Sequence, residues 1–192
     1  MDGISNERTE VPRQVRSAIK TYEKNKTKKL SELIEKTPKD ARELAIGFAA
    51  SSEVASEHFE SFYRCLGDFV HSKSGDLELD TVMGWCLQNF QRDPEAFVKE
   101  QSLYSYFDVR QQFSMWDGSH PKSVEAIKSR LNDPSSFKHD ETRFRIEKRS
   151  GTARLIVLTQ FRGTNAFGGV VRGIAKTVVD PNTGEVLEVE ID

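Results

Sequence analysis

The residues that first suggest chemistry are the glycines of one short segment, 160-QFRGTNAFGGVVRG-173. A glycine-rich turn that follows a strand and opens a helix can bind phosphate, because the free N–H groups of the helix end then meet the anion. Such a loop normally continues with a lysine and a hydroxyl residue. Here Gly168 and Gly169 run into Val170 and Val171, which are typical of a strand. We therefore do not expect a nucleotide site in this segment.

We interpret the segment instead as a corner between two strands. Gly163, Gly168 and Gly169 are expected to supply positive φ angles or close backbone approach, and the Asn165 side chain to anchor the turn. Phe167 has two open roles. It plugs the end of the sheet, which we favour because aromatic residues in glycine loops often pack inward, or it projects as a contact residue. The candidate partner-binding residues are Asn165, Phe167, Arg162 and Arg172.

The histidines and cysteines do not have the spacing of a metal site or of a nucleophile with its base. His58 and Cys65 lie seven residues apart on one side of a predicted helix, but His71 and Cys86 fall on different elements. Neither Cys-x-x-Cys nor His-Glu-x-x-His occurs. Both cysteines lie within apolar helical patterns, which indicates buried free thiols rather than a disulfide. We expect no catalytic residue, no metal and no cofactor, and a protein that is not an enzyme.

Charge is unevenly distributed along the chain, although the net charge is only −2. Residues 11–30 carry seven basic residues and one acid, whereas residues 43–100 carry four basic residues and eleven acids. The first segment is either a basic helix that packs on an acidic body, which we favour because no aromatic platform accompanies it, or a nucleic-acid-binding arm. The candidate nucleic-acid-binding residues are Arg13, Arg16, Lys20, Lys24, Lys26, Lys28 and Lys29.

The first half of the chain is predicted to be helical. Apolar residues recur at helical spacing from Val11 onward, Thr37 and Asp80 can cap two of the helices, and Pro38 suits a first helical position. The segment 102-SLYSYFDVRQQFSMWDGSHP-121 is rich in aromatic residues without a clear period. We interpret it as a packed connection. The sequence predicts a flexible tail at residues 1–10 and an α-helical domain at residues 11–115.

Strands must position the residues of the second half. Ser119 can cap a helix that has Pro121 in its first turn, and after Pro134 apolar residues recur at every second position. Turn residues at 150–151 and 180–184 separate the alternating segments. We predict an α+β domain at residues 119–192, a helix packed on an antiparallel meander of three or four strands. Acids along the last strand are expected to protect its edge, or alternatively to face a basic partner.

Three motifs of the second half carry a resemblance to a known type of module. They are RLNDPSSFK, QFRGTNAFGGVV and VDPNTGEV. Together they resemble a small C-terminal α+β module of bacterial lipoproteins and of phage or prophage proteins, in which a strand ends in an Asn-x-Phe-Gly-Gly loop. The resemblance covers about the last third of the chain and implies a shared fold. It transfers no catalytic residue, and the helical half has no such resemblance.

Composition limits the function classes. The chain of 192 residues is 36% hydrophobic and 30% charged, which is ordinary for a folded soluble protein. No apolar run approaches the roughly 18 residues of a membrane span, and the polar N-terminus has no apolar signal region, so we expect a cytoplasmic protein without a membrane partner. The sequence favours a non-enzymatic protein-binding or adaptor protein, phage- or prophage-encoded and acting on host machinery. The alternative is a nucleic-acid-associated protein, and the oligomeric state is left open.

Overall fold

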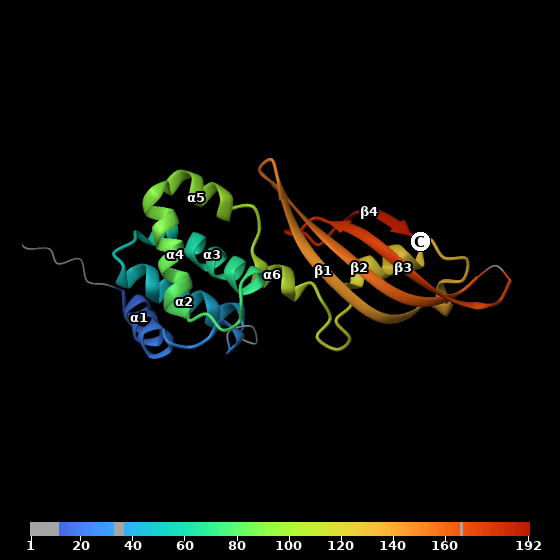
Figure 1. Ribbon diagram of the computed structural model, residues 1–192, viewed down its shortest axis with the longest axis horizontal. Coiled ribbons are helices and arrows are strands. Elements are labelled where there is room, and N and C mark those ends of the chain that lie inside the picture. The colour runs from blue at the N-terminus through green and yellow to red at the C-terminus, as the bar shows by residue number, and fades with distance from the viewer. Residues whose placement is uncertain (1–11, 33–36, 166) are drawn as a thin grey trace, which may run out of the picture. The chain divides into compact units, whose positions relative to one another are not determined.

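The computed structural model describes residues 12–32, 37–165 and 167–192 (Figure 1). They form two compact units, of which the first ends at Val98 and the second spans Lys99–Asp192. Helices make up the first unit, and a four-stranded antiparallel sheet dominates the second. This arrangement confirms the predicted α+β class. The tail predicted at residues 1–10 lies outside the described residues.

In the described part of the first unit the helices are, in chain order, α1 (Arg13–Asn25), α2 (Pro38–Ser51), α3 (Phe59–Ser72), α4 (Leu79–Arg92) and α5 (Pro94–Gln101), with short 3₁₀ helices η1 (Leu30–Glu32) and η2 (Ser56–His58). The last of them, α5, continues past Val98 into the second unit. Thr37 caps α2 as predicted, since its hydroxyl accepts the N–H of Asp40 at 3.2 Å. The cap predicted at Asp80 is wrong. Asp80 lies inside α4, and its carboxylate accepts the hydroxyl of Tyr22 instead. None of the helices in the described ranges is long and apolar enough to cross a membrane.

Aromatic rings fill the core of the helical unit. Phe62 of α3 is fully buried, and its ring centre lies 5.4–6.1 Å from those of Phe48, Phe90 and Phe97. A glycine allows α1 and α2 to pack closely. A Cβ on Gly47 of α2 would lie 2.2 Å from the carbonyl oxygen of Ala18, so only glycine lets α1 approach α2 this far.

The prediction of free thiols is wrong, because Cys65 of α3 and Cys86 of α4 form a disulfide. The apolar helical pattern correctly buries both side chains. The pattern does not predict that α3 packs against α4. That packing brings the two Cα atoms to 6.1 Å, within the range that a disulfide requires.

The sheet of the second unit is a meander in chain order, with every neighbouring pair of strands antiparallel (Figure 1). Its strands are β1 (Lys138–Arg149), β2 (Thr152–Thr164), β3 (Val170–Val179) and β4 (Val186–Ile191). Helices α6 (Tyr106–Gln111) and α7 (Pro121–Lys128) and the 3₁₀ helix η3 (Pro134–Ser136) precede it. Ile127 of α7 packs against Phe161 and Ala175, so this helix covers one face of the sheet. The opposite face carries the alternate residues of each strand.

Two details of the second unit differ from the sequence analysis. His120, not Ser119, caps α7, because its Nδ1 accepts the N–H of Ser123 at 3.1 Å. The division between the units falls at Val98, ahead of the domain boundary predicted at residues 115–119. The reason is aromatic packing. Phe113, which the prediction assigns to the helical domain, stacks on Phe144 of β1 with ring centres 4.6 Å apart.

Candidate functional site

The turn between β2 and β3 is anchored by Asn165, as the sequence predicts. Its Oδ1 atom accepts the N–H groups of Phe167 at 3.0 Å and Gly169 at 2.9 Å. Gly168 has a φ of +82°, which confirms the predicted need for glycine at this position. These hydrogen bonds from the main chain to the Asn165 side chain order the turn that carries Phe167.

Phe167 does not plug the sheet, so the role that we favoured is wrong. Its side chain is 96% exposed. The ring that fills the end of the core belongs to Phe161, which stacks on Phe137 at 5.3 Å. Phe161 is also the reason for Gly173 on the paired strand, because a Cβ there would lie 2.7 Å from the Phe161 ring. The close approach predicted for other glycines thus belongs to Gly173.

The two candidate arginines lie side by side next to this turn. Arg162 of β2 pairs with Arg172 of β3, and Lys138 of β1 pairs with Arg162 from the other side. We call these three residues the cationic row. Arg162 donates to Asp140 at 2.9 Å, whereas Arg172 makes no ion pair with any described residue. Like charges directly opposite one another destabilise a sheet, so the cationic row costs stability.

Exposed apolar side chains flank the cationic row on the same face of the sheet. Val170 is 75% exposed and Ile174 is 50% exposed. Because side chains alternate along a strand, Val170, Arg172 and Ile174 share the face opposite α7. We call Phe167, Val170, Arg172 and Ile174 the turn patch.

The basic residues of α1 divide into two groups. Arg13, Arg16, Lys20 and Lys24 are exposed, and their spacing of three and four residues places them on one stripe of the helix. None of these four makes an ion pair with a described residue. Lys26 instead pairs with Glu23 at 2.8 Å and Lys29 with Asp76 at 3.0 Å, while Lys28 lies in the turn after the helix.

The helix packs on its neighbour through a different face. Ala18 and Tyr22 of α1 are buried, and the Tyr22 ring meets Phe48 of α2 with ring centres 5.4 Å apart. The Thr21 hydroxyl also donates to Glu43 of α2 at 2.9 Å. The favoured interpretation, a basic helix on an acidic body, is therefore right about packing. It does not account for the charges of the exposed stripe.

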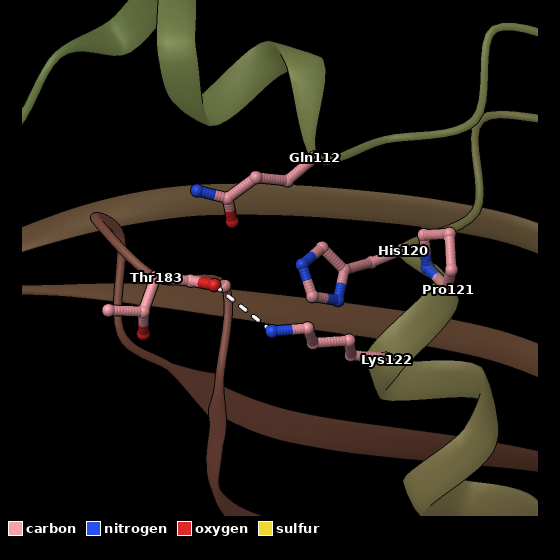
Figure 2. Close-up of a pocket in the computed structure, with 6 residues that line it drawn as sticks. Gln112, His120, Pro121, Lys122 and Thr183 are labelled. Carbon is pink, nitrogen blue, oxygen red and sulfur yellow. Dashed lines mark hydrogen bonds between the residues drawn. The ribbon is translucent and has the colours of Figure 1, made fainter.

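A cavity of about 220 Å³ lies between the end of α6, the start of α7 and the β3–β4 turn (Figure 2). Its lining residues are Gln112, His120, Pro121, Lys122, Thr183 and Gly184. Lys122 Nζ donates to the carbonyl oxygen of Thr183 at 3.1 Å. Gln112 Nε2 donates to Pro181, but its buried Oε1 atom has no hydrogen-bond partner among the described residues. Burial, with a smaller contribution from the Lys122 charge, lowers the pKa of His120 to about 4.

His120 and Ser123 resemble a nucleophile and its base in distance only. His120 Nδ1 lies 2.9 Å from Ser123 Oγ, the separation at which an imidazole can activate a hydroxyl. Ser123 is fully buried, and its hydroxyl also contacts that of Thr177 at 2.7 Å. A substrate cannot reach this buried hydroxyl. The pair instead caps α7 and satisfies hydrogen-bonding groups that are buried in the core. In the described parts of the chain, no group of three or more His, Cys, Asp or Glu side chains could hold a metal ion.

Met115 and Trp116 of the second unit form an exposed pair that was not predicted from the sequence. The aromatic-rich segment was predicted to pack, and Tyr104, Tyr106 and Phe107 are indeed buried. Met115 and Trp116 are instead 105% and 98% exposed. The sequence around them could have indicated this exposure, since Ser114 and Asp117-Gly118-Ser119 are typical turn residues.

Comparison with known proteins adds no identity to this geometry. No protein-family model, curated protein or solved structure gives a significant match to the chain.

Proposed function

We propose that the chain is a non-enzymatic adaptor that binds another protein through the turn patch. The observation that carries this proposal is the 96% exposure of Phe167 at the tip of a turn that hydrogen bonds hold in place. Aromatic residues and arginine are enriched in protein interfaces, and a small number of such anchors supplies most of the binding energy. A turn that is already ordered loses little conformational entropy on binding.

The surroundings of Phe167 support the same function. The cationic row places like charges opposite one another, which costs stability that an acidic partner surface would recover. Val170 and Ile174 supply apolar area beside Arg172. Polar recognition and apolar burial therefore meet within a few residues, as they do where the apolar core of an interface borders its polar rim.

The origin and location of the chain belong to the same proposal. We place it in the cytoplasm of a bacterial host as a phage- or prophage-encoded protein that acts on host machinery. The Cys65–Cys86 disulfide provides the test, because cytosolic reductants keep thiols reduced. Alkylation of host cells under denaturing conditions, which expose both buried thiols, should label both cysteines. Labelling of neither would place the chain in an oxidising compartment.

Truncation of the anchor tests the binding function. In a pull-down from the native host, Phe167→Ala should reduce recovery of the partner at least about tenfold, the effect expected of an interface anchor. Leu187→Ala is the matched control, since Leu187 is an exposed apolar residue of β4 outside the turn patch. Equal recovery with both variants would remove the turn patch as the binding site.

The second candidate function is nucleic-acid binding by α1. The stripe of Arg13, Arg16, Lys20 and Lys24 favours it, because these residues are exposed and make no ion pair with the described residues. Reversal of these four residues to Glu should lower the salt dependence of binding to a 20-nucleotide probe by about 3 in the log–log slope, the contribution of four phosphate contacts. Reversal of Lys26 and Lys29, which already have acidic partners, is the control. A slope that stays the same in the first variant excludes this function for α1.

A further inference from the structure

The loop Ser114–Ser119 is closed on itself by hydrogen bonds. Ser114 N–H donates to the carbonyl of Ser119 at 2.8 Å, and Gly118 N–H returns to the carbonyl of Ser114 at 2.9 Å. Ser114 Oγ accepts the N–H of Trp116 at 3.2 Å, and Asp117 Oδ1 accepts the N–H of Ser119 at 3.0 Å and its hydroxyl at 2.8 Å. Gly118 supplies the positive φ of +71° that the reversal needs. The tip of the loop is therefore pre-organised.

This ordered loop presents two large apolar side chains to solvent. Met115 is 105% exposed and Trp116 is 98% exposed. Tryptophan and methionine are both enriched at protein interfaces, and tryptophan is among the residues that contribute most to binding. Full exposure of both on an ordered loop leaves their apolar area available to a partner.

Charge narrows the class of partner. Asp117 is the only Asp, Glu, Lys or Arg among residues 112–120. Hydrogen bonds from the Ser119 backbone and from the Ser114 and Ser119 hydroxyls lower the pKa of Asp117 to about 2, so its carboxylate is charged at neutral pH. Its side chain is 44% exposed, and Oδ2 lies 3.6 Å from His139 Nδ1. An anionic tip repels a phosphate backbone and an acidic bilayer, because proteins bind both of these through Lys and Arg side chains.

We infer that the loop Ser114–Ser119 is a second protein-binding site, in which Met115 and Trp116 enter an apolar pocket bordered by an arginine or lysine of the partner. The apolar pair supplies the buried area, and Asp117 meets the cation at the rim. The inference rests on the proposed protein-binding function but uses none of the turn-patch residues. An adaptor requires two such sites, and this loop provides the second.

Site-specific crosslinking identifies what the loop touches. Met115 is replaced by the photo-crosslinker p-benzoylphenylalanine in the full chain, expressed in the native host, and exposed Gln111 is replaced in the same way as the control. We expect a protein adduct at position 115 that position 111 does not give, with the crosslinked peptide at an apolar pocket next to Arg or Lys. Adducts to lipid or nucleic acid, or no adduct above the control, overturn the inference.

Affinity for the purified crosslinked protein then measures the contributions. Trp116→Ala should weaken binding about 30-fold or more, the effect of a central interface anchor. Asp117→Asn keeps the acceptor that closes the loop but removes the charge, so it should weaken binding about threefold to tenfold, and only at low salt. Phe167→Ala should leave this affinity unchanged. An unchanged affinity for Trp116→Ala overturns the inference. If Phe167→Ala leaves partner recovery in the pull-down unchanged, that result overturns only the turn patch as a binding site.

Discussion

Two exposed turns of the sheet-containing unit, at Asn165–Gly169 and Ser114–Ser119, differ in charge but not in construction. Each is closed by its own hydrogen bonds, one through Asn165 and the other through Asp117, and each presents an aromatic side chain that is almost fully exposed. The turn patch contains Arg172 and adjoins the rest of the cationic row, whereas the loop Ser114–Ser119 has a single carboxylate. Under the proposed function the two turns would therefore not compete for one partner surface, since the first would meet an acidic surface and the second a basic one.

Loss of the ring beneath the turn patch should have the largest effect. Phe161→Ala removes a buried ring that stacks on Phe137 and fills the space over Gly173, so we expect a loss of about 3–5 kcal/mol in the free energy of unfolding. Phe167→Ala is a control of the same residue type and should change stability by less than about 0.5 kcal/mol, since its ring is exposed. Hydrogen exchange of β2 and β3 measures both. Similar protection in the two variants would contradict the assignment of Phe161 to the core.

Loss of each turn's anchor should have the next largest effect and should be local. Asn165→Ala removes the acceptor of two N–H groups in one turn, and Asp117→Ala removes the acceptor of Ser119 in the other. We expect each to cost about 1–2 kcal/mol, the usual range for lost side-chain to backbone hydrogen bonds. Amide exchange should rise in the altered turn alone. Faster exchange in both turns after either substitution would show that they are not independent.

Acidification should destabilise the sheet-containing unit because it protonates the buried His120, which directly follows the loop Ser114–Ser119 in the chain. Its pKa is about 4 when folded and near 6.5 when unfolded, so the unfolded state binds the proton more readily between these values. Stability is therefore complete above pH 7 and falls as the pH drops from 6.5 to 4.

The control for this pH effect is His120→Asn, which keeps a residue suited to a helix cap but does not titrate. Urea unfolding at pH 7 and pH 4.5 compares the two proteins. The carboxyl groups titrate equally in both proteins, so only the difference in stability between the two proteins reports on His120. Identical slopes of stability against pH would exclude a buried neutral histidine at this position.

The sequence predicts local features of these regions well and their surroundings poorly. The Asn165 anchor, the Thr37 cap and the meander follow from turn chemistry and from the period of apolar residues, which depend on near neighbours along the chain. The exposure of Phe167 and of Trp116 depends on which other ring fills the core. Phe161 and Phe113 take those places, and they do so through contacts with Phe137 and Phe144 on other elements.

Long-range pairing accounts for the missed disulfide, which requires α3 to lie against α4. The cap of α7 is a local error, because it depends on whether the ring of His120 reaches the nearby N–H of Ser123. The cationic row is a further example of long-range pairing. Lys138, Arg162 and Arg172 lie on three different strands and become direct neighbours only through the register of those strands. Periodicity identifies the faces of a strand but not the residue opposite each position.

The smallest expected effect on stability is also the one that best separates structure from function at the turn patch. Arg172 lies directly opposite Arg162, and no described acid pairs with it, whereas Arg162 has Asp140. Arg172→Ala should therefore stabilise the fold by about 0.2–1 kcal/mol, since it removes like-charge repulsion, and thermal unfolding at low salt measures the gain. The same variant should recover less partner in the pull-down. Arg162→Ala is the matched control and should not stabilise, because it leaves Asp140 without its cation. A gain in stability with unchanged partner recovery would show that Arg172 is only a source of strain, and it would leave Phe167 as the one anchor of the turn patch.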